Sequence, residues 1–159
     1  MNLSIPRKSL RTVLMMAVLA IPLPALATTR AYIGPDGGNW NSAINWNPSG
    51  VPANNDVVFV TTFDASDRTV NFDGNYAAPG LSQLRVDPIS TGNFGAATLI
   101  QTANTMVASE LDVGVVGRGR YVQSGGINQA PYLYLGGGGT GTYDLSGSAT
   151  LNPGFASNG

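Results

Sequence analysis

Near its C-terminus the chain repeats itself with a period of 22 residues, over the blocks 89–110, 111–132 and 133–154, and a fourth block begins at residue 155. A fixed period of this length is typical of solenoids, in which every repeat forms one turn of a coil. The last two blocks are identical at Leu111 and Leu133, Gly114 and Gly136, Gly117 and Gly139, Gly119 and Gly141, Tyr121 and Tyr143, Ser124 and Ser146, Gly125 and Gly147, and Pro131 and Pro153. The repeat therefore predicts a coil whose successive turns stack on one another.

Within a repeat, apolar residues alternate over short stretches that glycine-rich corners interrupt. Alternate side chains of a strand face opposite sides, so such stretches indicate strands with one buried face. Glycine is expected at the corners because a positive φ or a close backbone approach excludes a Cβ there. The positions expected to carry the coil are Leu111, Gly114, Gly119, Tyr121, Gly125, Leu133, Gly136, Gly141, Tyr143 and Gly147. The pattern predicts an all-β fold, a parallel β-solenoid with rungs of about 22 residues.

Equivalent side chains of stacked rungs should form ladders inside the coil. We expect Gln101 and Gln123 to form an internal amide ladder, and Leu111, Leu133 and Phe155 to form an apolar one. The fourth block stops five residues after it begins. This end leaves a sheet edge unpaired, which leads us to expect further repeats of a longer parent chain.

Residues 28–88 precede the repeats and hold both tryptophans, Trp40 and Trp46, in a stretch rich in Gly and Asn. Short β-branched and aromatic runs follow, so we expect an irregular N-terminal cap that ends in the first strands. The two tryptophans have two interpretations. They either plug the open end of the coil, which the need to cover a terminal turn favours, or they offer exposed faces to a carbohydrate.

Residues 1–27 have the composition of a secretory signal peptide. Arg7, Lys8 and Arg11 precede an apolar run that ends in Ala-Leu-Ala, which predicts cleavage after Ala27. A membrane-spanning helix needs ~20 apolar residues, and prolines interrupt a shorter stretch here. We therefore expect an exported chain that has no membrane span after the signal is removed.

Composition excludes several classes of function. The chain contains no Cys and no His, which excludes disulfides, the usual zinc sites and Ser-His-Asp or Cys-His catalysis. After residue 27 it holds five arginines and no lysine, against nine acidic residues. Nucleic acid binding needs clustered basic residues, so that partner is not expected. Arg118 and Arg120 are the one close basic pair, and we expect them at a solvated corner.

Two local patterns suggest ligand sites, and neither completes the motif that it resembles. The run 137–144 is rich in glycine, but it lacks the lysine of a phosphate loop and its Asp144 falls one place beyond that of a calcium β-roll. Asp64, Asp67 and Asp73 are the one local group of acids, as in β-helical enzymes that act on polysaccharides. Asp in such turns commonly binds its own backbone, so we expect no enzyme, cofactor or metal.

The segments 119–126 and 133–147 resemble the repeat of bacterial type V secretion (autotransporter) passengers and of PEP-CTERM-associated surface proteins. The resemblance extends over residues 89–159. It implies a right-handed parallel β-helix and a protein that is secreted or displayed at the cell surface. It carries over no catalytic residue.

Together these observations predict an exported structural or adhesive β-solenoid module of a bacterial surface or secreted protein. Two alternatives remain: a carbohydrate-binding or carbohydrate-processing β-helix, and a fragment of an autotransporter passenger. The expected partners are extracellular polysaccharide or cell-surface components.

Overall fold

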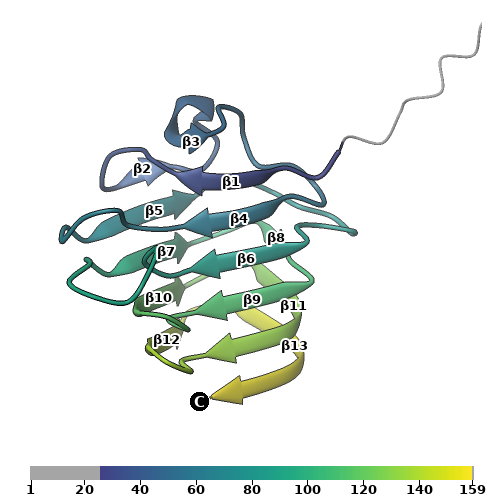
Figure 1. The fold of residues 1–159 in the computed structure, drawn as a ribbon. Helices are drawn as coiled ribbons and strands as arrows, with labels where there is room; N and C mark the ends of the chain where they lie inside the picture. Colours follow the sequence, from purple (N-terminus) through teal and green to yellow (C-terminus); the bar gives the residue numbers. More distant parts are fainter. Residues whose placement is uncertain (1–25, 159) are drawn as a thin grey trace, which may run out of the picture.

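A computed structural model describes residues 26–158 as a stack of parallel β-rungs (Figure 1). The signal peptide predicted for residues 1–27 therefore lies almost wholly outside the described residues. Apart from one short 3-10 helix, η1 (Ala43–Asn45), the regular elements are strands, and all pair in parallel except β1 with β3. Within residues 26–158, no helix is long and apolar enough to cross a bilayer.

The strands form two sheets, and the chain passes repeatedly from one to the other (Figure 1). The large sheet runs in the order β13-β11-β9-β6-β4-β1-β3, with β8 also paired to β11. Its strands are β1 (Thr29–Tyr32), β3 (Trp46–Asn47), β4 (Val57–Val60), β6 (Gln83–Val86), β8 (Thr105–Val107), β9 (Glu110–Val113), β11 (Ile127–Leu135) and β13 (Thr150–Asn158). The small sheet, in the order β12-β10-β7-β5-β2, contains β2 (Gly38–Asn39), β5 (Arg68–Phe72), β7 (Ala97–Gln101), β10 (Arg118–Gln123) and β12 (Thr140–Leu145).

The register of the sheets confirms the predicted β-solenoid. Leu111 pairs with Leu133 across β9 and β11, and Tyr121 pairs with Tyr143 across β10 and β12. Gly119 also pairs with Gly141. Residues one sequence period apart thus lie on adjacent strands, ~4.8 Å apart across the sheet.

The coil begins earlier than the sequence repeat. Val58 on β4 pairs with Leu84 on β6, and Leu84 pairs with Leu111 on β9, so segment 28–88 contributes regular rungs in addition to a cap. In the small sheet, Val70 on β5 pairs with Leu99 on β7. These early rungs are longer because their corners are longer. Variable corner length removes the fixed period from the sequence while the sheet register persists.

The interior holds columns of side chains that run through the rungs. In the large sheet the column includes Val58, Leu84, Leu111 and Leu133, each at most 2% exposed. A matching column in the small sheet consists of Val70, Leu99, Tyr121 and Tyr143. Because each rung covers the next, the stack shares burial that one rung could not achieve by itself.

Gln101 and Gln123 lie in register as predicted, but tyrosines and backbone take the hydrogen bonds of their amides. Gln101 and Gln123 pair in register and are both fully buried. Tyr121 Oη donates to Gln101 Oε1 at 2.8 Å, and Tyr143 Oη donates to Gln123 Oε1 at 2.6 Å. Each Gln Nε2 donates to two main-chain carbonyls, which satisfies its two hydrogens. The two amides therefore bond to tyrosines and backbone instead of to each other.

The last rung is offset by one residue, which corrects one predicted ladder. The corner before β13 (146–149) is one residue longer than the corner before β11 (124–126), so Leu133 pairs with Ala156 and Tyr132 with Phe155. Phe155 faces outward and is 53% exposed, so its predicted place above Leu111 and Leu133 is wrong. Pro131 and Pro153 are likewise not partners, because Pro153 pairs with Ala130.

The repeated glycines serve two different needs. Gly114 and Gly136 have φ of +64° and +79°, the left-handed region in which L side chains are strained. Gly141 has an ordinary φ, but an added Cβ would overlap the carbonyl oxygen of Val113. At the next corner the positive φ falls on Gly126 and Gly147, so Gly125 and Gly147 are not equivalent.

Candidate functional site

Both tryptophans lie in the core at the N-terminal end of the coil. Trp40 is 0% and Trp46 1% exposed, and their rings meet edge to face with centroids 4.8 Å apart. Trp46 Nε1 donates to the Trp40 carbonyl at 2.7 Å, and Trp40 Nε1 donates to Tyr76 Oη at 2.8 Å. A buried indole cannot stack on a sugar ring. The alternative in which Trp40 and Trp46 contact carbohydrate is therefore wrong, and they close the end of the core.

Asp64, Asp67 and Asp73 accept hydrogen bonds from backbone N–H groups and do not converge on a common site. Asp64 Oδ1 accepts from the Ser66 N–H at 2.9 Å, which lowers the pKa of Asp64. Asp67 Oδ1 accepts from the N–H of residue 96, one rung further on, at 2.6 Å. Asp73 Oδ1 accepts from the N–H of residue 41 at 2.7 Å. Asp64 thus stabilises its own turn, whereas Asp67 and Asp73 each tie a loop to a segment of a neighbouring rung.

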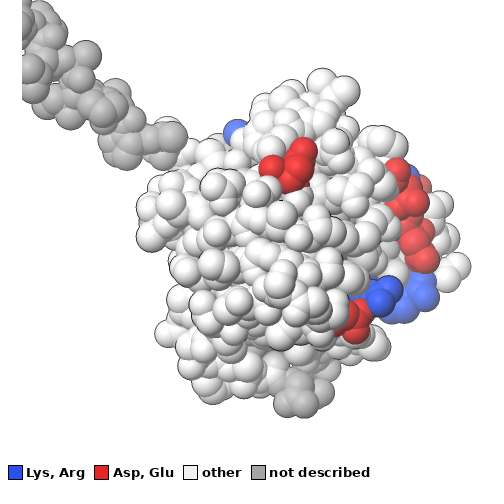
Figure 2. Space-filling model, turned by 180° about the vertical axis from the view of Figure 1, so that it is seen from behind, with Lys and Arg blue, Asp and Glu red and all other residues white. Residues whose placement is uncertain are grey.

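The basic pair lies on a strand and not at a corner. Arg118 and Arg120 belong to β10 and point outward from the small sheet. Arg120 Nε contacts Asp144 Oδ2 at 2.6 Å, and Arg118 lies 3.7 Å from Asp67. Figure 2, which shows the molecule from behind, has acidic and basic side chains side by side at one edge, with most of the visible surface uncharged. Among the described residues, no group of three or more Asp or Glu side chains is placed to hold a metal ion.

A single row of outward side chains crosses the large sheet, and we call it the outer track. Pairing aligns one residue from each of six strands in succession: Ala31, Phe59, Arg85, Asp112, Tyr134 and Ser157. The track runs along the axis of the coil, because each residue sits one strand beyond the last. It brings together aromatic rings, a guanidinium and a carboxylate that are far apart in the sequence.

Two carboxylates share one donor at the middle of the track. Gln83 Nε2 donates to Glu110 Oε1 at 2.6 Å and to Asp112 Oδ2 at 3.0 Å. Asp112 is 7% exposed, and burial together with the nearby Glu110 charge raises its pKa to about 6. Arg85 lies next to it on the track and opposes this rise.

One buried atom at this point lacks a hydrogen-bond partner within the described chain. Asp112 is bonded through Oδ2 to Gln83. On the adjacent strand, Arg85 Nε is buried and has no acceptor among residues 26–158. Arg85 lies over the Phe59 ring, 6.0 Å from its centroid. A buried donor therefore stands unsatisfied on the strand next to Asp112, which is costly unless another group accepts its hydrogen.

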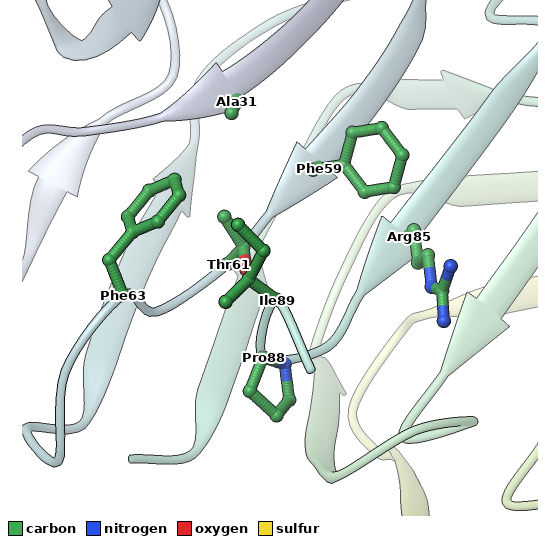
Figure 3. A pocket seen from close by; sticks show the side chains of 7 residues that line it. All are labelled: Ala31, Phe59, Thr61, Phe63, Arg85, Pro88 and Ile89. Carbon is green, nitrogen blue, oxygen red and sulfur yellow. The ribbon is translucent and has the colours of Figure 1, made fainter. Parts of the chain in front are cut away.

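A cavity opens at each end of this polar centre. The first, of about 270 Å³, is lined by Ala31, Phe59, Thr61, Phe63, Arg85, Pro88 and Ile89 (Figure 3). The second, of about 300 Å³, is lined by Asp112, Val115, Tyr134, Leu135, Gly136, Gly137 and Ser157. Tyr132 and Phe155 form a neighbouring outward row and are 52% and 53% exposed. Apolar cavities with a few convergent polar groups and a perturbed pKa are the usual form of a ligand site.

Sequence reasoning missed this arrangement because half of it precedes the repeat. Gln83 and Arg85 belong to a longer rung, so the 22-residue period does not align them with Glu110 and Asp112. Apolar and polar residues alternate around Leu84 and around Leu111, and this shared pattern is the signal that would have aligned the two strands. The outward residues on either side of each leucine then fall into the same rows.

These features define the chain as a parallel β-solenoid whose large sheet carries an aromatic and carboxylate-lined outer face. No family model, no curated protein and no solved structure matches it.

Proposed function

We propose that the protein is an exported structural and adhesive β-solenoid module of a bacterial surface or secreted protein, and that it acts without catalysis. The observation that supports this most is the unbroken parallel register of both sheets from β4 to the last rung. Such a coil is a rigid rod with repeated faces, which suits extension from a surface and contact along its length.

Two features of the sequence support export. The order of basic, apolar and small residues in segment 1–27 is that of a cleaved signal. The repeats also resemble those of autotransporter passengers and PEP-CTERM-associated proteins, which are secreted or surface-displayed. The chain contains no cysteine, so its fold is independent of the redox state on either side of the membrane.

Export is tested by expressing the full sequence in a Gram-negative bacterium and measuring the N-terminus of the accumulated protein by mass spectrometry. We expect Thr28 as the first residue, and protease or antibody access to the protein on intact cells or in the medium. The variant Ala27→Arg serves as a control and should accumulate as the uncleaved precursor. A chain that keeps residues 1–27 and stays in the cytoplasm contradicts the proposal.

A second candidate is a carbohydrate-processing β-helix, which the Glu110 and Asp112 pair favours. Paired carboxyl groups, one of them with a raised pKa, are the groups that glycoside hydrolysis uses, and the pKa of Asp112 is raised to about 6. Release of reducing ends from a polysaccharide, lost in both Glu110→Gln and Asp112→Asn, would establish this function. Absence of release in a folded protein leaves the structural and adhesive proposal in place.

A further inference from the structure

The outer track is continuous over six strands, which suits a linear ligand. Neighbouring track residues are one rung apart, ~4.8 Å in the direction of the coil axis. The two cavities lie towards opposite ends, and the cluster of Gln83, Arg85, Glu110 and Asp112 lies between them. A chain of repeated units laid along the track would meet an apolar wall, a polar centre and a second apolar wall.

Partly exposed aromatic rings stand at both ends of the track. Phe59 and Phe63 line the first cavity and flank Thr61 in Figure 3. Tyr134 lines the second cavity, and its ring lies 6.4 Å from that of Phe155. Aromatic rings provide large rigid apolar faces, and a sugar ring offers a matching face of C–H groups. Partly exposed aromatic rings at both cavities indicate a partner whose surface alternates between apolar and polar groups.

The polar centre narrows the chemistry of the ligand. Arg85 Nε needs an acceptor, and the Asp112 carboxyl group lies on the adjacent strand. A hydroxyl group both accepts and donates, so one hydroxyl or a neighbouring pair can accept from Arg85 Nε and donate to Asp112. An acidic ligand would face the two carboxylates of Glu110 and Asp112, and an ammonium group offers no acceptor to Arg85 Nε. A neutral ligand rich in hydroxyl groups therefore fits best.

We propose that the outer track binds a neutral oligosaccharide chain lying along the coil axis, with its rings against Phe59, Phe63 and Tyr134 and its hydroxyls on Asp112 and Arg85. The inference rests on the proposed adhesive function and names the face and the ligand class. The inference assigns Trp40 and Trp46 no part in binding, because both side chains are buried in the core.

The test is isothermal titration of the protein purified after expression of the full sequence. The probes are the neutral hexasaccharides cellohexaose, maltohexaose and N-acetylchitohexaose, with hexagalacturonate and hexalysine as charged alternatives. We expect at least one neutral probe to bind, and both charged probes to bind more weakly. Tyr134→Ala and Asp112→Asn should each weaken binding about tenfold or more, equivalent to ~1.4 kcal/mol.

Matched variants separate a binding role from a folding role. Tyr134→Phe keeps the ring and should retain affinity, and Asp144→Asn removes an exposed carboxylate from the small sheet and should leave affinity unchanged. Circular dichroism and melting temperature show whether each variant remains folded. The inference is overturned if no neutral probe binds the folded protein, if a charged probe alone binds, or if Tyr134→Ala and Asp112→Asn both bind as tightly as the parent.

The failure of this inference is distinguishable from failure of the proposed function. An exported, cleaved protein that binds none of the neutral probes refutes the carbohydrate face and leaves the structural module. A protein that binds a neutral probe through Tyr134 and Asp112 but keeps residues 1–27 supports the face and refutes export.

Discussion

Tyr121 and Tyr143 stack inside the coil with ring centroids 4.8 Å apart and planes within 5° of parallel. The separation is that of two strands in a sheet, so the stack follows directly from the register of β10 and β12. Each hydroxyl reaches the glutamine of the preceding rung, as Tyr121 does to Gln101 at 2.8 Å. The stacked pair therefore links three rungs through rings and hydrogen bonds at once.

Removing the Tyr121 hydroxyl should destabilise the fold. In Tyr121→Phe, the fully buried Gln101 Oε1 loses its hydrogen-bond donor. An unsatisfied buried acceptor costs about 1–3 kcal/mol, which urea unfolding can measure. The matched change Tyr134→Phe, on the outer face, should alter stability by less than about 0.5 kcal/mol. Equal effects in the two variants would contradict the buried network.

Gly141 should not tolerate a side chain, and nearby Gly138 should. In Gly141→Ala, the new Cβ overlaps the Val113 carbonyl oxygen, so the backbone of adjacent rungs must separate. We expect a loss of about 2–4 kcal/mol, seen as a lower melting temperature. At Gly138 the nearest atom to an added Cβ is 3.4 Å away, so Gly138→Ala should be nearly neutral. Equal melting temperatures for Gly141→Ala and Gly138→Ala would contradict the steric argument.

Asp112 should make the protein less stable as the pH rises. Its folded-state pKa of about 6 lies above the ordinary value of 3.8, so folding favours the protonated carboxyl. The unfolded chain releases this proton first, and stability falls between about pH 4 and pH 6 by up to about 3 kcal/mol. Asp112→Asn removes the titrating group.

The pH prediction is checked by unfolding both proteins from pH 4 to pH 8. The asparagine variant should be the more stable of the two at pH 7.5, and the difference should shrink towards pH 4. The opposite trend, with the parent gaining on the variant as the pH rises, would show that Asp112 is stabilised as an anion.

Trp40 should be needed for the fold. Its ring is fully buried and meets Trp46, Phe72 and Tyr76 edge to face. Trp40→Ala should cost about 3–5 kcal/mol, measured by denaturant unfolding. Ile44→Ala alters a residue of η1 that is 80% exposed and should cost little. Retention of parent stability in Trp40→Ala would refute the role of the indole as an end plug.

The sequence predicts the class of fold because the repeats are regular where corners are short. Leu111, Leu133, Tyr121 and Tyr143 fall in register since equal corner lengths separate them. The sequence period does not predict the earlier rungs, because the lengths of their loops vary. Only the alternation of apolar and polar residues around Val58 and Leu84 indicates that these segments are strands. The predicted position of Phe155 is wrong for the same reason. A single added residue in the corner before it moves its side chain from the interior of the coil to the outer face.

The candidate site is harder to predict than the fold. The sequence leaves two interpretations of Trp40 and Trp46, of which it favours the end plug, and only their burial decides between the plug and a sugar contact. Asp112 looks isolated, because its partners Gln83 and Arg85 reach it only through the sheet. A site on a solenoid face is assembled across rungs, so no local motif contains it.

The extra residue in the corner 146–149 has a practical consequence. The chain there gains length, yet β13 still pairs with β11 along its course. This corner is thus a permissive position, where foreign peptide can be grafted without disturbing the strands. An epitope tag placed after Ser148 would be carried on the outside of the rod, which makes the molecule a candidate carrier for engineered presentation of peptides.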